Sequence, residues 1–186
     1  MLDLFFFSQL NSLVPLLSVN ITNGECDVKL NVKQAFFKKI LFFLKKSELG
    51  GNFHILSDLT GADFVNINKR FKCFYNLLSI YNTKRILISF TVNEFDSIES
   101  INDIFYNSLW YERELWDMFG IFVLNHLDLR RILTDYGFEG FPLRKNFPVI
   151  GFFDITYDFF QKTILFNTIE LSQNFNEYNY INPWKI

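Results

Sequence analysis

The chain has few of the residues from which metal and redox sites are usually built. Its 186 residues include two cysteines and two histidines. Zinc and non-haem iron usually take several histidine or cysteine ligands, and iron–sulfur clusters are held by cysteine thiolates. The sequence therefore argues against a resident metal or cluster. The two isolated thiols, Cys26 and Cys73, are expected to be free and buried rather than joined.

Long apolar runs and basic tracts are also lacking. The longest apolar pieces, Leu4–Phe7 and Ile40–Leu44, are far shorter than the roughly 18 residues that a membrane-spanning helix needs. The formal net charge is −2 and the charges are scattered, so the composition gives no nucleic-acid footprint. No basic residue precedes Lys29, which is typical of neither a secretory signal nor an Arg-rich transit peptide. We therefore expect the chain to be made in the compartment where it works.

Apolar and aromatic side chains are abundant instead. Hydrophobic residues make up 49% of the chain, with 25 phenylalanines but only two alanines. This content supports a packed core and argues against disorder. Because phenylalanine, isoleucine, asparagine, lysine and tyrosine share AT-rich codons, we interpret the skew as a genome bias that says little about function.

Hydrophobic periodicity and turn residues predict a mixture of helices and strands. Helices are expected over Leu2–Leu13, Lys33–Lys46, Asp96–Asn107 and Leu109–Phe119, the last ending at Gly120. Strands are expected over Leu16–Ile21, Cys26–Val32, Phe53–Leu59, Phe71–Ile80, Arg85–Val92 and Lys162–Glu170. The adjacent runs Phe71–Ile80 and Arg85–Val92 predict a hairpin.

These elements predict an α/β (α+β) fold with one mixed β-sheet flanked by helices. We assign residues 1–125 to this domain, including the Trp110–Gly120 helix. From residue 126 to residue 186, glycine and proline interrupt the chain too often for long elements. The end of this stretch is too aromatic for a free linker, so residues 126–186 are predicted to form an irregular, extended C-terminal arm that docks on partner subunits.

The most informative stretch is Trp110–Phe147, where eleven charged residues stand among aromatic and aliphatic ones. Six are acids and five are bases, a near balance that predicts ion pairs where water is partly excluded. Such a place is either an active site or an interface. The acids are Glu112, Glu114, Asp117, Asp128, Asp135 and Glu139, and the bases are Arg113, Arg130, Arg131, Arg144 and Lys145.

The helix in this stretch has two interpretations. Its apolar stripe favours an amphipathic helix with a charged outer face, on which Arg113 and Asp117 are placed to form an ion pair. A general acid–base pair drawn from its carboxylates, Glu112, Glu114 or Asp117, is the less favoured alternative because no nucleophile stands beside them. His126 lacks companions for a metal site and is expected to be buried or capping.

The basic doublets Arg130–Arg131 and Arg144–Lys145 also have two interpretations. They either hold an anionic substrate or, as we favour, form ion pairs with acids within the chain or across an interface. We predict no catalytic, cofactor-binding or metal-binding residues. The predicted interface residues are Glu112, Arg113, Glu114, Asp117, His126, Asp128, Arg130, Arg131, Arg144 and Lys145.

The motifs YEREL-WDMFGI and H-x-DLRRIL, within Tyr111–Leu133, resemble the signature of the thirty-kilodalton (NuoC-type) subunit family of respiratory complex I. The likeness continues through Thr134–Pro148 and returns at Arg70–Ser79, Ser97–Glu114 and Glu170–Trp184. Three residues depart from the family pattern. Leu127 stands where the family usually has a proline, Phe141 where it has a histidine and Asn146 where it has an aspartate. A catalytic histidine at position 141 is therefore impossible in this protein.

The resemblance implies a core subunit of the peripheral arm, in the quinone module of proton-pumping NADH:ubiquinone oxidoreductase. Such a subunit binds no cofactor itself, and NADH, FMN, iron–sulfur clusters and ubiquinone are held elsewhere in the complex. The implied partner is chiefly the forty-nine-kilodalton subunit. The implied location is the matrix side of the mitochondrial inner membrane. The lack of transit-peptide features and the abundance of residues with AT-rich codons together suggest an organelle-encoded chain, and the alternative is a bacterial homologue on the cytoplasmic face of its membrane. The alternatives are the equivalent subunit of a membrane-bound hydrogenase-type complex and, less favoured, a stand-alone carboxylate-based hydrolase.

Overall fold

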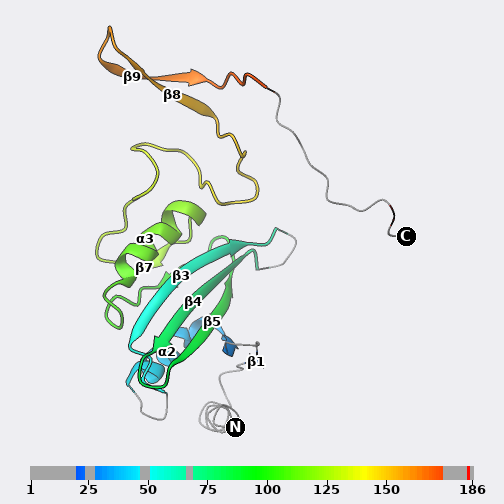
Figure 1. The fold of residues 1–186 in the computed structure, drawn as a ribbon, viewed down its shortest axis with the longest axis vertical. Coiled ribbons are helices and arrows are strands. Elements are labelled where there is room, and N and C mark those ends of the chain that lie inside the picture. Colours follow the sequence, from blue (N-terminus) through cyan, green and yellow to red (C-terminus); the bar gives the residue numbers. More distant parts are fainter. Residues whose placement is uncertain (1–19, 24–27, 47–50, 66–68, 174–183, 185–186) are drawn as a thin grey trace. The chain divides into compact units, whose positions relative to one another are not determined.

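The chain forms two compact units, Met1–Phe147 and Pro148–Ile186. A computed structural model describes residues 20–23, 28–46, 51–65, 69–173 and 184 (Figure 1). The predicted helix over Leu2–Leu13 lies outside the described residues, as do Cys26 and most of the predicted strand Leu16–Ile21. None of the helices formed by the described residues is long and apolar enough to cross a membrane.

The first unit is built on a five-stranded sheet in the order β1-β2-β5-β4-β3. Its strands are β1 (Asn20–Asn23), β2 (Val28–Asn31), β3 (Ile55–Asp63), β4 (Phe71–Ser79) and β5 (Lys84–Val92). Strand β2 pairs with β5 in parallel, and all other neighbours are antiparallel. The predicted mixed sheet and the β4–β5 hairpin are therefore confirmed.

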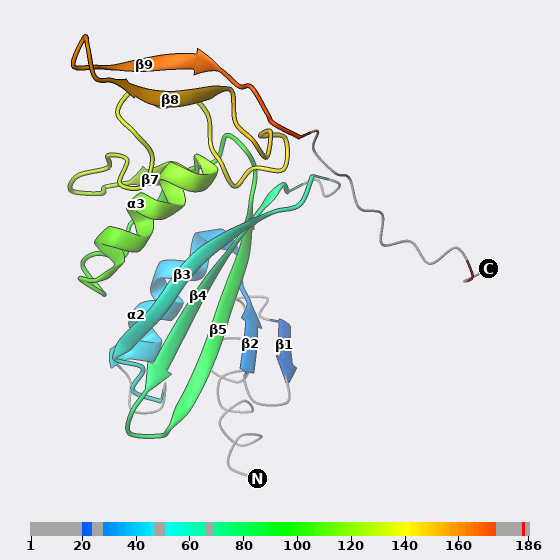
Figure 2. The ribbon, with the colours of Figure 1, turned by 45° about the horizontal axis from the view of Figure 1, so that its top comes forward.

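Two helices pack on the same face of this sheet. The 3-10 turn η2 (Gln34–Phe36) leads into α2 (Phe37–Lys46), and α3 is Ser108–Phe119. Alternate residues of β4 are buried, so one face of the strand forms the core. The Phe37 ring of α2 lies 4.4 Å from the Tyr75 ring on that face. Helix α3 lies beside the neighbouring strand β3 (Figure 2), and its Leu115 and Phe119 side chains approach β3 at Gly61.

The start of α3 is also fixed by hydrogen bonds to the edge strand β3. The pairing of β3 with β4 is irregular between Leu56 and Asp58. Asn107 Nδ2 donates to the Leu56 carbonyl at 2.8 Å, and Tyr111 Oη donates to the Ser57 carbonyl at 3.1 Å. The carbonyl groups near this irregularity thereby gain partners, and the helix is aligned with the edge of the sheet.

The helix predicted over Asp96–Asn107 is wrong. This stretch instead holds the short strand β6 (Ile98–Glu99), which pairs in parallel with β7 (Val123–Leu124) and continues into turns. The Ile98 N–H donates to the Phe122 carbonyl at 2.9 Å, and the Ser100 N–H donates to the Leu124 carbonyl at 2.9 Å. These long-range bonds replace the helical ones, while the apolar side chains that gave the helical spacing are buried in the turns.

In the second unit, β8 (Phe153–Asp158) and β9 (Thr163–Thr168) form an antiparallel hairpin. Strand β9 matches the strand predicted at Lys162–Glu170, whereas its partner was not predicted. The preceding stretch, from Asn125 to Phe147, consists of turns and bends without helix or strand. It nevertheless belongs to the first compact unit.

The contact between α3 and β3 generates a stability prediction. A Cβ at Gly61 would lie 2.9 Å from Leu115 Cδ1 and 3.0 Å from Phe119 Cδ2, closer than carbon atoms approach. We expect Gly61→Ala to lower the free energy of unfolding by about 1–3 kcal/mol in urea denaturation because the helix must shift. Thr60→Val, at an exposed position on the opposite face, serves as the control. Equal stability of Gly61→Ala and the parent chain would contradict this packing.

Candidate functional site

The charged segment is organised around a buried carboxylate on α3. The Asp117 side chain is 0% exposed. Its Oδ2 accepts hydrogen bonds from the main-chain N–H groups of Ile132, Leu133 and Thr134 at 3.1, 2.7 and 3.0 Å. Its Oδ1 accepts from Thr134 Oγ1 at 2.6 Å and Arg131 Nη1 at 3.1 Å. One carboxylate thus fixes the course of three consecutive residues.

The Arg113 side chain donates hydrogen bonds to main-chain carbonyl groups of the same loop. Its Nε donates to the Arg130 carbonyl at 3.0 Å and its Nη2 to the Arg131 carbonyl at 3.3 Å. The predicted ion pair between Arg113 and Asp117 is therefore wrong, because both side chains serve the loop rather than each other. The predicted charged outer face is also wrong at Asp117, which is fully buried. Glu112 is fully buried as well, whereas Glu114 is exposed.

Glu112 connects α3 to the β6–β7 pair. Its Oε2 accepts a hydrogen bond from Ser100 Oγ at 2.6 Å, and its Oε1 accepts from the Ile101 N–H at 2.8 Å. His126 Nε2 lies 3.8 Å from Glu112 Oε2, and the two side chains are 1% and 0% exposed. The prediction of a buried histidine is confirmed.

The hydrogen bonds of His126 indicate which ring nitrogen carries the proton. Nδ1 accepts from the Asp128 N–H at 3.0 Å, so it has no proton in this arrangement. Nε2 lies 3.2 Å from the Leu109 carbonyl, which can only accept. The neutral ring is therefore protonated at Nε2, and it joins the 126–128 turn to the first turn of α3.

The two buried carboxylates of α3 have opposite pKa shifts. Burial raises the pKa of Glu112, against the opposing effects of the hydrogen bonds from Ile101 and Ser100. Burial alone would also raise the pKa of Asp117. There the hydrogen bonds from Thr134, Leu133 and Ile132 outweigh it, and the net pKa is lowered. Asp117 is thus held as an anion by its donors, whereas Glu112 binds a proton more readily than an exposed glutamate.

A second cluster ties the end of the segment to the sheet. Arg70 donates to both carboxylate oxygens of Asp63 at 2.8 Å and to Glu94 Oε2 at 3.2 Å. Arg144 Nη1 donates to Glu94 Oε1 at 2.7 Å, and the Lys145 N–H donates to Asp63 Oδ2 at 2.8 Å. The hydrogen bond from Arg70 is the main reason that the pKa of Asp63 is lowered. Asp63, Arg70 and Glu94 were not predicted, because Asp63 and Glu94 also bind Lys145 and Arg144, which lie 82 and 50 residues further along the chain.

Gly120 ends α3 and lets the loop pack against it. It has a φ of +71°, and a Cβ there would lie 2.5 Å from the Phe141 ring and 2.7 Å from Arg144 Nη2. Arg144 Nε donates to the Phe119 carbonyl at 2.6 Å, so it caps the end of the helix. The Phe141 ring lies 4.5 Å from the Arg144 guanidinium carbon and 5.1 Å from that of Arg131. The phenylalanine that departs from the family pattern is therefore a contact for two arginines.

The Asp128 and Arg130 side chains lie outside these clusters, whereas Asn146 joins the second one. Asp128 and Arg130 form an exposed ion pair at 3.0 Å, with 59% and 74% of their side chains accessible. Asn146 accepts a hydrogen bond from Arg70 Nη2 at 2.8 Å, so its amide oxygen occupies an acceptor position without a charge. The interpretation that the basic doublets form ion pairs with acids within the chain is confirmed for Arg131 and Arg144. That the segment also forms an interface stays a prediction.

Residues 30–153 match the family described as the respiratory-chain NADH dehydrogenase, 30 Kd subunit. The chain belongs to this family. It is 42% identical over 150 residues to NADH-ubiquinone oxidoreductase subunit 9 of Prototheca wickerhamii, and the match covers 81% of this chain and 78% of that protein. It is 38% identical over 159 residues to a subunit of the NADH-quinone oxidoreductase of Paramagnetospirillum magneticum, covering 86% and 79% respectively.

A third relative is the NADH dehydrogenase [ubiquinone] iron-sulfur protein 3 of Solanum tuberosum, 45% identical over 131 residues, covering 70% of this chain and 69% of that protein. A similar fold occurs in a solved structure of the membrane-bound sulfane sulfur reductase, an archaeal respiratory membrane complex. The TM-score is 0.68 at 18% identity, covering 81% of this chain and 88% of that chain. The resemblance inferred from the motifs is thus confirmed. The chain is a subunit of respiratory NADH:ubiquinone oxidoreductase, and its partners are other subunits of that enzyme.

The Asp117 contacts predict a large effect of a small substitution. Asp117→Asn keeps the shape but removes the charge, and in either orientation it turns the amide NH₂ toward at least one N–H group, which cannot accept. We expect a loss of about 3 kcal/mol in the free energy of unfolding, measured in urea. Asp128→Asn, at the exposed ion pair, should change it by no more than about 0.5 kcal/mol. Similar losses for both variants would contradict a special role for Asp117.

The raised pKa of Glu112 predicts a pH dependence. The unfolded chain releases this proton near pH 4.5 and the folded chain at a higher pH. Between these values the folded state binds more protons, so the contribution of Glu112 to the free energy of unfolding falls as the pH rises. Relative to the parent chain, Glu112→Gln should therefore gain stability from pH 4.5 upward until the raised pKa is passed. Glu114→Gln, at the exposed neighbour, should run parallel to the parent; parallel behaviour of Glu112→Gln would refute the assignment.

Proposed function

We propose that this chain is a non-catalytic subunit of the peripheral arm, in the quinone module of the enzyme, which positions neighbouring subunits and holds no redox cofactor itself. The observation that carries this proposal is the full engagement of the buried carboxylates by donors of the same chain. A catalytic acid or base needs to reach a substrate proton. Glu112 and Asp117 are both 0% exposed, and their hydrogen bonds all run to the chain itself.

Asp117 illustrates why a catalytic role is disfavoured. It receives five hydrogen bonds, whereas a carboxylate offers about four lone-pair sites. Its pKa is lowered, so it is also a weak base. A catalytic carboxylate would instead need an oxygen atom that faces a cavity and is free to accept a proton from a substrate. The arrangement supports a structural role for the signature.

We also propose that NADH, FMN, iron–sulfur clusters and ubiquinone are held by other subunits, and the described residues bear on the iron–sulfur clusters. Across the described parts of the chain, no group of three or more histidine, cysteine, aspartate or glutamate side chains is placed to hold a metal ion. Cys73 is fully buried in the sheet, and burial raises the pKa of its thiol to about 12. A thiol that resists ionisation is a poor metal ligand.

The hairpin of the second unit supports an arm that docks on a partner, for which we propose the forty-nine-kilodalton subunit. Side chains of directly paired residues lie on the same face of a hairpin. One face presents Ile155 opposite Phe166 and Tyr157 opposite Ile164, and these four side chains are 46–63% exposed. The other face presents Thr156, Asp158 and Asn167, among others. A two-stranded hairpin alone is at best marginally stable, so an apolar face of this kind favours a covering partner.

We further propose that the complex lies with this subunit on the matrix side of the mitochondrial inner membrane and that the gene is organellar. The abundance of residues that have AT-rich codons supports an organellar gene. The relatives named as acting on ubiquinone are consistent with a mitochondrial respiratory chain.

The proposed docking of the hairpin predicts a difference between its two faces. Replacing the paired residues Ile155 and Phe166 by lysine should strongly reduce the amount of this chain in the assembled enzyme, because two charges would enter an apolar contact. The matched control replaces Thr156 and Asn167, which lie on the polar face and are joined by a side-chain hydrogen bond, by lysine. Native-gel separation of membranes, with the chain quantified by mass spectrometry, gives the measurement. Equal incorporation of both double variants would refute docking through the apolar face.

A further inference from the structure

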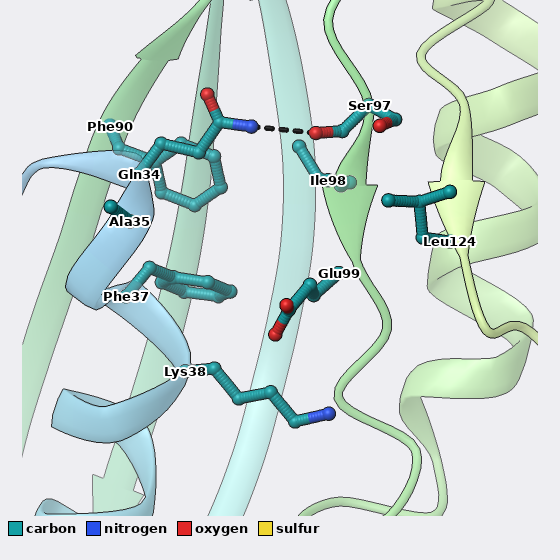
Figure 3. A pocket seen from close by; sticks show the side chains of 9 residues that line it. All are labelled: Gln34, Ala35, Phe37, Lys38, Phe90, Ser97, Ile98, Glu99 and Leu124. Atoms are coloured by element: carbon teal, nitrogen blue, oxygen red, sulfur yellow. Dashed lines mark hydrogen bonds between the residues drawn. The ribbon is translucent and has the colours of Figure 1, made fainter.

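A cavity of about 330 Å³ lies between the η2–α2 segment and β6 (Figure 3). Phe37 and Phe90 line its inner part together with Ile98. All three side chains are almost fully buried, so the cavity has an apolar floor. Lys38 and Glu99 carry opposite charges at its mouth. A cavity of this size is small for a ligand site, where about 300–1,000 Å³ is usual, but it can hold one bulky side chain with room for the adjoining main chain.

The main chain of β6 borders the cavity with an unpaired edge. The N–H groups of Ile98 and Ser100 both point to the β7 side. Main-chain groups alternate between the two edges of a strand, so the N–H and C=O of Glu99 point to the opposite edge. Strands β6 and β7 form a two-stranded sheet among the described residues, and no third strand lies at that edge. Two main-chain groups are thus presented toward the cavity.

Gln34 shows how this edge is recognised within the chain. Its side-chain amide Nε2 donates to the Ser97 carbonyl at 2.6 Å. The Ser97 carbonyl lies on the same edge as the main-chain groups of Glu99, two residues along. The amide of Gln34 therefore occupies the place that an N–H of a third strand would take, and the next position of the edge lies beside the cavity (Figure 3).

We propose that the cavity docks an extended segment of a neighbouring subunit, which pairs with the main chain of Glu99 and places one bulky apolar side chain against Phe37, Phe90 and Ile98. Strand addition at a free edge gains affinity from main-chain hydrogen bonds and specificity from side-chain pockets. Lys38 and Glu99 fit a segment in which an acidic and a basic residue flank the apolar one. Lys38 already contacts the half-exposed Asp103 at 3.2 Å, so it is held at the mouth of the cavity. This inference rests on the proposed function, because the segment belongs to another subunit of the same enzyme.

Steric filling of the cavity tests the proposal. Ala35 lines the cavity and is exposed, so Ala35→Trp can enter the space without replacing a core residue. Lys39→Trp, at an exposed position of α2 that does not line the cavity, is the matched control. Circular dichroism and urea denaturation should show both variants folded. Incorporation into the native enzyme should fall several-fold for Ala35→Trp and stay unchanged for Lys39→Trp.

Equal incorporation of the two tryptophan variants would overturn the proposed docking site while leaving the proposed function intact. Absence of the parent chain itself from the purified enzyme would instead refute the proposed function. A bound small molecule, lost from the enzyme in native mass spectrometry on Ala35→Trp substitution, would show that the occupant is not a polypeptide and would also overturn the proposal.

The neighbouring lysines Lys38 and Lys39 give a second test without substitution. The purified enzyme and the chain released from it are treated with an amine-reactive reagent, and the two sites are quantified by mass spectrometry. Assembly should lower the reactivity of Lys38 relative to Lys39, because only Lys38 borders the cavity. Carbodiimide coupling should join Lys38 or Glu99 to a peptide of another subunit. An unchanged Lys38-to-Lys39 ratio would contradict an occupied cavity.

Discussion

A carboxylate cannot stay ionised away from water unless donors replace its hydration. Asp117 meets this requirement with the N–H groups of Ile132, Leu133 and Thr134, so the loop must pass the helix at one fixed place. The same requirement at Asp63 brings Arg70 and the Lys145 N–H together at the far end of the segment. Charged hydrogen bonds thus hold both ends of this irregular stretch, which buries little apolar surface of its own. The shape of the first unit depends on these two carboxylates.

The arrangement also explains why acids and bases are balanced in this part of the chain. A buried acid needs its donors nearby, and each arginine at the loop needs acceptors that tolerate its charge. Arg144 meets both needs, since it contacts Glu94 and also caps α3 at the Phe119 carbonyl. Glu112 extends the same principle to the β6–β7 pair through Ser100 and Ile101. A surface made in this way suits the proposed role of positioning neighbouring subunits, for which the hairpin and the cavity beside β6 are the proposed contacts.

The sequence allowed the mixed sheet, the β4–β5 hairpin and α3 with its terminal glycine to be predicted, because local periodicity determines them. It did not allow the β6–β7 pair to be predicted. Ile101, Ile104 and Phe105 have helical spacing, but they are buried in the turns that follow β6, because long-range main-chain bonds hold the stretch. The predicted ion pair between Arg113 and Asp117 is wrong for a similar reason. The spacing of residues within a helix does not show that a distant loop will pack over the helix and bind these side chains. Asp63, Arg70 and Glu94 were missed because Glu94 and Asp63 meet partners 50 and 82 residues along the chain.

If the signature charges stabilise the fold and the assembly and take no part in the reaction, Asp117→Asn should change the number of complexes and not their activity. The measurement is the NADH:quinone turnover per assembled complex in membranes whose only copy of this chain carries Asp117→Asn. We expect fewer complexes to assemble, while each assembled complex turns over at the parental rate. Normal assembly with turnover abolished would contradict it and would place Asp117 in the reaction itself.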